Sequence, residues 1–145
     1  MNFELDEEQV MLKTSARDFL EKECTKKHVR GMMDDEKGYS PELWKKIADL
    51  GWLGLTLPEE CGGVGCGFLN LVVLLEECGR ALLPAPLIST VVLTGHPILA
   101  AGTDEQKKHF LPRIASGEII LTLAFVEASG GLEASDVTAT ATPSG

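Results

Sequence analysis

The sequence predicts a mainly α-helical fold: an amino-terminal helical bundle followed by the first one or two strands of a β-domain. Up to Gly117, apolar residues recur three and four positions apart in stretches bounded by capping residues, glycine or proline. Beyond Gly117 the pattern changes to a run of β-branched and aromatic residues, which favour strands. Helices first and strands last suggest separate units, so we divide the chain into a helical domain, 1–117, and the start of a β-domain, 118–145.

The first helix is predicted to begin after Asp6, because Asp6 and Gln9 have the spacing of a capping box. Apolar residues follow at helical spacing, and we expect this helix to fade near His28 and end at Gly31. A second helix is predicted from Ser40-Pro41 to Gly51, with serine as the cap and proline in the first turn.

Three further helical segments complete the predicted bundle of five or six helices. The first, from about Phe68 to Leu82, is apolar nearly all round and is expected to be central. The next runs from Pro86 to Ala101 with a kink at 95–97, where Gly-His-Pro interrupts it. The last opens at a capping box formed by Thr103 and Gln106 and ends at Gly117.

Two strands are expected after Gly117. Ile119–Glu127 (IILTLAFVE) is β-branched and aromatic with partial alternation, and Val137–Thr142 is a shorter candidate beyond a glycine-containing loop. Two strands by themselves form a marginal sheet in water. The pattern therefore suggests a piece of a larger protein.

Composition narrows the possible functions. Hydrophobic residues make up 44% of the 145 residues, enough for a core, and the formal net charge of -9 argues against a nucleic-acid surface. The apolar stretch 82–101 is interrupted by proline and glycine, so no membrane span is expected, and no signal peptide is recognised; we expect a cytoplasmic protein. The four cysteines lack metal-ligand spacing, which predicts free thiols and no metal site.

Four local patterns occur together in a fixed order. They are LPEECGG, the apolar helix ending in EECGRAL, the block AGTDEQKKHFLPRIASGE, and LAFVE followed by a glycine loop and Ser135-Asp136. This ordered set resembles the acyl-CoA dehydrogenase family over essentially the whole chain. The resemblance implies an FAD-dependent oxidoreductase of fatty acid metabolism that converts an acyl-CoA thioester to the 2-enoyl-CoA.

The resemblance also implies what the chain lacks and what it would meet. The family's glutamate base commonly lies in a carboxy-terminal bundle that has no counterpart in this sequence, so we expect no catalytic residue here and no activity from this chain alone. The expected partners are acyl-CoA and an electron-transfer flavoprotein. The full-length protein is expected to be a homo- or hetero-oligomer, either a dimer or a tetramer.

For the cofactor, the resemblance points to the strand at Phe125, Val126 and Glu127 and to the loop residue Ser135, which would also approach the CoA. A hydroxyl residue is common in the family where this chain has Val126, and Ala128 replaces a common proline. The main-chain contacts of the strand with the flavin are still expected. A plain buried strand, and a simple turn at Ser135, are the competing interpretations.

For the substrate, the resemblance points to Pro86, Ser89, Thr90 and Leu93 as wall of the acyl cavity. Their spacing places them on one face of an α-helix, which is equally compatible with ordinary core packing. The glycine run 62–67 matches no phosphate-binding motif and is interpreted as a structural loop. The histidines His28, His96 and His109 are expected to be isolated.

Two alternatives to the enzyme remain open at this stage. The departures at Val126 and Ala128 are compatible with a degenerate, non-catalytic partner subunit of an acyl-CoA dehydrogenase. A non-enzymatic helical interaction module is the second alternative. The remainder of the open reading frame would distinguish these alternatives, since a further β-domain and a bundle with a glutamate base belong only to the enzyme.

Overall fold

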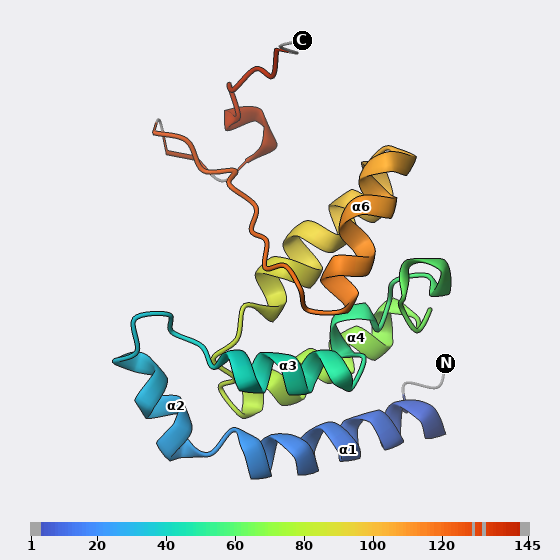
Figure 1. The fold of residues 1–145 in the computed structure, drawn as a ribbon, viewed down its shortest axis with the longest axis vertical. Coiled ribbons are helices and arrows are strands. Elements are labelled where there is room, and N and C mark those ends of the chain that lie inside the picture. Colours follow the sequence, from blue (N-terminus) through green and yellow to red (C-terminus); the bar gives the residue numbers. More distant parts are fainter. Residues whose placement is uncertain (1–3, 129, 132, 143–145) are drawn as a thin grey trace.

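The computed structural model describes residues 4–128, 130–131 and 133–142, and the described chain is helical (Figure 1). The expectation of five or six helices is confirmed, since these residues form six α-helices, one π-helical segment and three short 3₁₀ turns. Their bounds are α1 Glu7–Glu23, α2 Lys26–Met33, α3 Pro41–Asp49, η1 Trp52–Gly54, η2 Glu59–Cys61, α4 Phe68–Arg80, η3 Ile88–Gly95, α5 His96–Ala101, α6 Asp104–Ala115 and η4 Ala134–Asp136.

The predicted strands are wrong for the described residues. Neither 119–127 nor 137–142 forms a ladder, and the chain after α6 extends away from the helices (Figure 1). A β-strand exists only when a neighbouring strand pairs with its N–H and C=O groups, and no such neighbour lies among the described residues. Residue type favours an extended backbone here, but extension without pairing is not a sheet.

The predicted first helix is divided in two. Its capping box is confirmed, because the Asp6 carboxylate accepts from the Gln9 amide at 2.8 Å while the Gln9 side chain accepts from the Asp6 amide. The end at Gly31 is wrong: α1 stops at Glu23, and Thr25 caps a new helix by accepting from the His28 amide. Gly31 lies inside α2 and ends neither helix, because the cap at Thr25 starts a new helix before the chain reaches this glycine.

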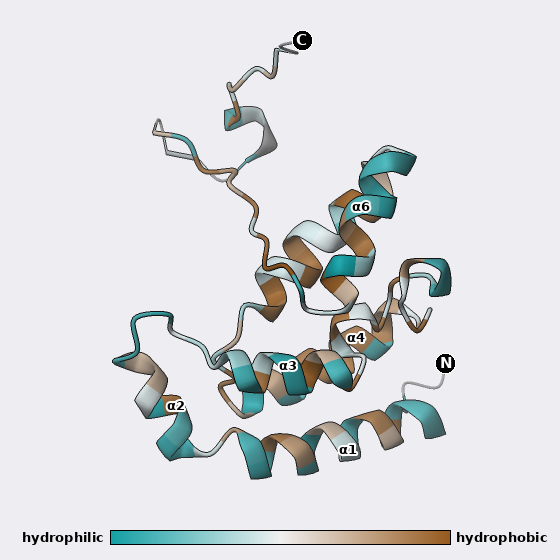
Figure 2. Cartoon of the chain, viewed as in Figure 1, coloured by the Kyte–Doolittle hydropathy of each residue, from teal (hydrophilic) through white to brown (hydrophobic). Residues whose placement is uncertain are grey.

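The core lies where α1, α3, α4, η3 and α6 meet, and α1 packs along α4. Figure 2 shows α6 hydrophilic in its first turn and apolar where it lies against the bundle. The apolar side chains with no exposed surface are Ala16, Leu20, Ile47, Leu53, Leu57, Leu71, Leu74, Val91, Leu111 and Ile114. Leu71 and Val91 are thus enclosed within the chain itself, which reduces the apolar area left exposed on α4 and η3.

The fourth predicted segment also differs in its type of helix. Residues Ile88–Gly95 form a π-helical segment, in which the Thr94 hydroxyl donates to the Ser89 carbonyl at 2.8 Å. The amide of His96 likewise donates to the carbonyl five residues before it. The predicted interruption at 95–97 is confirmed as the boundary between η3 and α5, where Pro97 occupies the first turn of the new helix.

Candidate functional site

The residues expected to wall an acyl cavity are placed differently from one another. Thr90 is fully buried, Pro86 and Ser89 are half-buried, and Leu93 is 39% exposed. Their spacing describes one face of an α-helix, whereas a π-helical turn takes up more residues and rotates the later ones away. The expected common face is therefore not formed by all four.

The hydroxyl groups of this segment bind backbone. Thr90 Oγ1 donates to the Leu121 carbonyl and accepts from the Leu121 amide, both at 3.2 Å. Ser89 Oγ donates to the Pro86 carbonyl at 3.0 Å. Thr90 thus fastens the first residues after α6 to η3, and its hydroxyl is explained without a ligand.

An apolar groove lies beside these residues, between the end of α4 and the start of η3. It encloses about 170 Å³ and is lined by Leu75, Cys78, Gly79, Leu82, Leu83, Ala85, Leu87 and Ile88. Leu82 and Ile88 are 70% and 57% exposed, so the groove opens to solvent. A surface of this kind can hold an apolar chain and exclude water from it.

Cys78 supplies no nucleophile to this groove. Burial first, then nearby Cys24 and Glu77, raises the pKa of the Cys78 thiol to about 12. The thiol is therefore protonated at neutral pH, and a protonated thiol is a poor nucleophile. The groove is therefore an apolar surface without reactive groups of its own.

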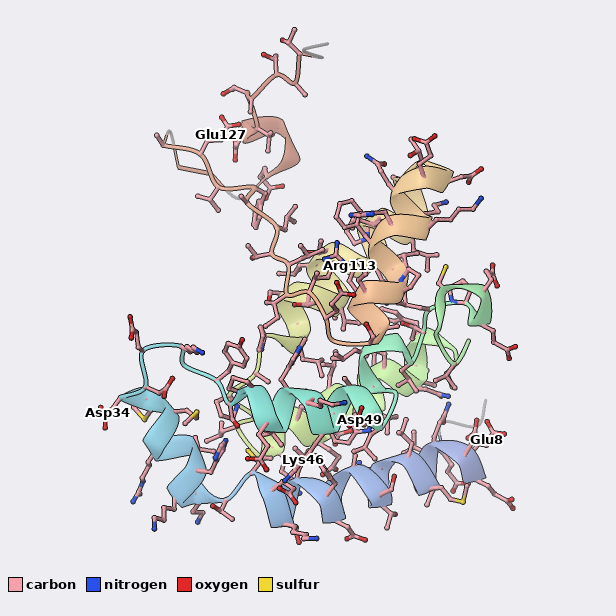
Figure 3. All side chains as sticks on the ribbon, viewed as in Figure 1. Glu8, Asp34, Lys46, Asp49, Arg113 and Glu127 are labelled. Carbon is pink, nitrogen blue, oxygen red and sulfur yellow. The ribbon has the colours of Figure 1, made fainter. Side chains whose placement is uncertain are left out.

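The residues expected at the flavin edge lie on the extended segment after α6. Phe125 and Val126 are 39% and 59% exposed, and the backbone groups of 122–126 have no hydrogen-bond partner among the described residues. Ser135 is exposed in η4. Figure 3 shows Glu127 on this segment, well away from Arg113 of α6.

Glu127 is already engaged within its own segment. Its carboxylate accepts from the hydroxyl of Thr138, from the amide of Ala139 at 2.7 Å and from the amide of Thr138, and these bonds, the hydroxyl's first, lower the pKa of Glu127. The carboxylate therefore links Glu127 to residues 138–139. The structure does not bring the expected flavin-edge residues together with the expected substrate residues.

Sequence reasoning missed the buried carboxylate of Glu77. Arg17 of α1 binds it with two hydrogen bonds, at 3.0 and 2.6 Å, and Arg80 adds a third at 2.7 Å. Glu77 has no exposed surface, and the hydrogen bond from Arg17 is the main cause that lowers its pKa to about 2. The adjacent Glu76 is exposed. The two residues have the same side chain, and they differ in burial only because they lie on different faces of α4.

The contacts of the glycine run and of two histidines are also clear from the structure. The amides of 62–66 all donate to backbone carbonyls of 54–59, which leaves none of these five free to bind phosphate. His96 is not isolated: its Nε2 lies 3.0 Å from Thr56 Oγ1 and its ring stacks edge-on against Phe68. His109 is not isolated either, since its Nε2 lies 3.2 Å from Nη1 of Arg113. The buried Nε2 of His28, in contrast, has no partner in the described part of the chain.

Two classes of site are absent from the residues that the structure describes. No group of three or more metal-binding side chains comes together in them. No helix among them has the length and apolar content needed to cross a membrane.

A small helical bundle with an apolar groove and an exposed extended segment defines an α-helical domain that presents an apolar surface. Residues 6–118 match the family described as "Acyl-CoA dehydrogenase, N-terminal domain". The chain belongs to this family.

Curated relatives include both dehydrogenases and reductases. "Acryloyl-CoA reductase (NADH)" of Anaerotignum propionicum is 36% identical over 97% of this chain and 36% of its own length. "(2S)-methylsuccinyl-CoA dehydrogenase" of Cereibacter sphaeroides is 36% identical over 88% of this chain and 23% of its own. The chain spans about a third or less of these relatives.

Solved structures agree with the fold. A chain of the ChsE4-ChsE5 complex from Mycobacterium tuberculosis is 31% identical, with a TM-score of 0.82 over 90% of this chain and 36% of that one. An acyl-CoA dehydrogenase complexed with FAD from Bacillus anthracis is 29% identical, with a TM-score of 0.80 over 88% of this chain and 22% of that one.

Proposed function

We propose that this chain is the helical wall of the acyl pocket and one edge of the flavin site in a full-length FAD-dependent acyl-CoA dehydrogenase. The reaction is oxidation of an acyl-CoA thioester to the 2-enoyl-CoA. The observation that carries the proposal is the apolar groove between α4 and η3, which occurs in a member of this family and contains no reactive group. The base and most of the cofactor contacts would come from outside these residues.

The groove would hold the apolar chain of the substrate and exclude water from it. Leu82 and Ile88 form its open rim, and the half-buried Pro86 and Ser89 would extend the wall beside Ile88. Thr90 is fully buried and Leu93 is 39% exposed, so these two would contribute to the wall only where other parts of the full-length protein cover η3. Excluding water strengthens electrostatic interactions at the thioester carbonyl, which favours removal of the α-proton. The chain's part in the reaction is therefore binding and desolvation.

The extended segment fits one edge of a flavin. Its unpartnered amides and carbonyls at 122–126 are the groups that hydrogen-bond to the polar edge of an isoalloxazine ring, and Phe125 offers an apolar surface. Bound FAD would accept hydride from the substrate's β-carbon. Val126 adds no side-chain hydrogen bond, and Ser135 would approach the cofactor and the CoA from the loop.

A domain exchange tests the proposal. Residues 6–142, which include the extended segment after α6, would replace the corresponding part of the Bacillus anthracis acyl-CoA dehydrogenase, and the chimera would be assayed for bound flavin and for oxidation of acyl-CoA. We expect both to be retained. Ile88→Glu in the chimera should leave flavin bound while abolishing oxidation, because it places a charge in the groove.

The matched control is Val64→Glu, which changes an equally exposed apolar residue outside the groove and should keep activity. A folded chimera, verified by circular dichroism, that neither binds flavin nor oxidises acyl-CoA would refute the proposal. Reduction of enoyl-CoA alone would place the protein with the reductases instead.

A non-catalytic partner subunit is the second candidate. Val126 and Ala128 depart from the family's pattern at the flavin edge, and one similar structure is a complex of two proteins, ChsE4 and ChsE5. A chimera that folds and binds acyl-CoA but no flavin would favour this candidate. Association with an electron-transfer flavoprotein, and the cytoplasmic location, stay predictions.

A further inference from the structure

A second, larger groove lies between the carboxy-terminal end of α1, helix α2 and the chain at the end of α4. It encloses about 670 Å³, within the usual range for small-molecule sites. Apolar side chains of α1, of α2 and of the turns after α1 and α4 form its floor and walls; they are Leu20, Cys24, Val29, Met33, Ala81 and Leu82. The proposed acyl groove is a separate space that shares only Leu82 with it.

The rim of this groove is cationic although the protein is acidic. Lys26, Arg30 and Arg80 line it together with a single carboxylate, Glu21. Arg80 is held by Glu77 at 2.7 Å and lies 3.5 Å from Glu21. Lys26 and Arg30 are exposed, one helical turn apart, and neither has an ion-pair partner in the described residues.

Among the described residues, helix α2 is only partly covered by the rest of the protein. It buries none of its residues, and Met33 is 80% exposed. Figure 1 shows α2 beyond the end of α1, at the side of the bundle, and Figure 3 places Asp34 at its outer end. Lys26 and Arg30 line the same groove as Val29 and Met33, so one ligand can contact both kinds of group.

We propose that this groove binds a small anionic amphiphile, an unbranched apolar chain that ends in a carboxylate. The chain would lie on the surface formed by Val29, Met33 and Ala81, and the carboxylate would accept hydrogen bonds from Lys26 and Arg30. Two unpaired cations beside an apolar floor match a ligand that joins one negative group to one apolar chain. The inference does not depend on the proposed function.

Decanoate is the first probe, measured against the 145-residue chain by isothermal titration calorimetry below its micelle-forming concentration. Decanol has the same chain without the charge, and decyltrimethylammonium has the opposite charge. Charge-assisted hydrogen bonds predict that decanoate binds at least about tenfold more tightly than either. Each added methylene should increase affinity about three- to fourfold until the floor is covered.

Variants locate the site. The double variant Lys26→Glu/Arg30→Glu should weaken decanoate binding by more than about tenfold. Lys107→Glu/Lys108→Glu makes the same charge change on α6, away from the groove, and should bind as the unaltered chain does. Ile88→Glu, in the neighbouring acyl groove, should also leave binding unchanged, which separates this inference from the proposed function.

Three results would overturn the inference. Equal binding of decanol and decanoate would remove the role of the cations, and loss of binding in Ile88→Glu would assign the ligand to the other groove. Sedimentation with vesicles of phosphatidylglycerol and phosphatidylcholine, without binding of decanoate, would make the surface a membrane contact. The comparison of the three probes uses the unaltered chain, so it stands even if a variant fails to fold.

Discussion

Replacing Glu77 by glutamine tests whether the buried carboxylate holds α1 against α4. Arg17 and Arg80 keep the pKa of Glu77 at about 2 instead of 4.5. By linkage this corresponds to roughly 3 kcal/mol of folding stability at neutral pH. Both arginines are about 40% exposed, so water screens them, and we expect Glu77→Gln to lower the free energy of unfolding by about 2 kcal/mol.

The loss should depend on pH in a defined direction. Because the pKa of Glu77 is lower in the folded state, its contribution is complete above about pH 4.5 and disappears as the pH falls through about 2. Urea unfolding followed by circular dichroism at a series of pH values measures the difference between the unaltered chain and Glu77→Gln. That difference should shrink to near zero at the acid end, because both chains are then neutral at this position.

Glu76→Gln is the matched control. Glu76 is the preceding residue, and its exposed pair with Lys13 at 3.2 Å should contribute less than about 1 kcal/mol. Equal losses in the two variants, or a loss in Glu77→Gln that stays constant down to pH 2, would refute the assignment of stability to the buried charge.

Three further substitutions test the backbone by the same unfolding measurement. Leu82→Gly should stabilise the fold by about 0.5–1 kcal/mol, because Leu82 has a left-handed φ of 54° and an exposed side chain. Leu50→Gly, at an exposed right-handed position, is the control and should destabilise the fold. A loss of stability in both variants would show that the backbone at Leu82 is not strained. Gly63→Ala should cost about 3 kcal/mol or more, because its Cβ would overlap backbone of the preceding loop, while Gly67→Ala meets open space and should be tolerated. Thr90→Val should cost about 1–3 kcal/mol and increase amide exchange at 119–121; unchanged exchange would show that the hydroxyl does not hold that segment.

Local signals in the sequence were sufficient for much of the helical domain. Asp6 with Gln9 and Thr103 with Gln106 each form the predicted capping box, because a cap depends on residues only three positions apart. Gly51 likewise adopts the left-handed conformation expected after a helix. The division at 117, the flavin-edge residues and the substrate residues stay predictions.

Other features were beyond the reach of local patterns. The helix that was expected to end at Gly31 is divided at Thr25, because Thr25 caps the start of α2, and Gly31 is tolerated inside that helix. The predicted strand at 119–127 was wrong, because a strand needs a partner strand to pair with, and a short stretch of sequence does not reveal whether that partner is present. The large groove between α1, α2 and the end of α4 is lined by residues as far apart in the sequence as 20 and 82, so no local sequence motif indicates it.

The sequence by itself determined the helical class, most helix starts and the family, since these depend on periodicity, caps and ordered motifs. Only the tertiary structure decided which of two adjacent glutamates, Glu76 or Glu77, is buried, because α1 lies along one face of α4 and places Arg17 there. It also decided that the Thr90 hydroxyl binds backbone. Burial and pairing depend on which surfaces meet, and that is fixed by the packing of distant segments.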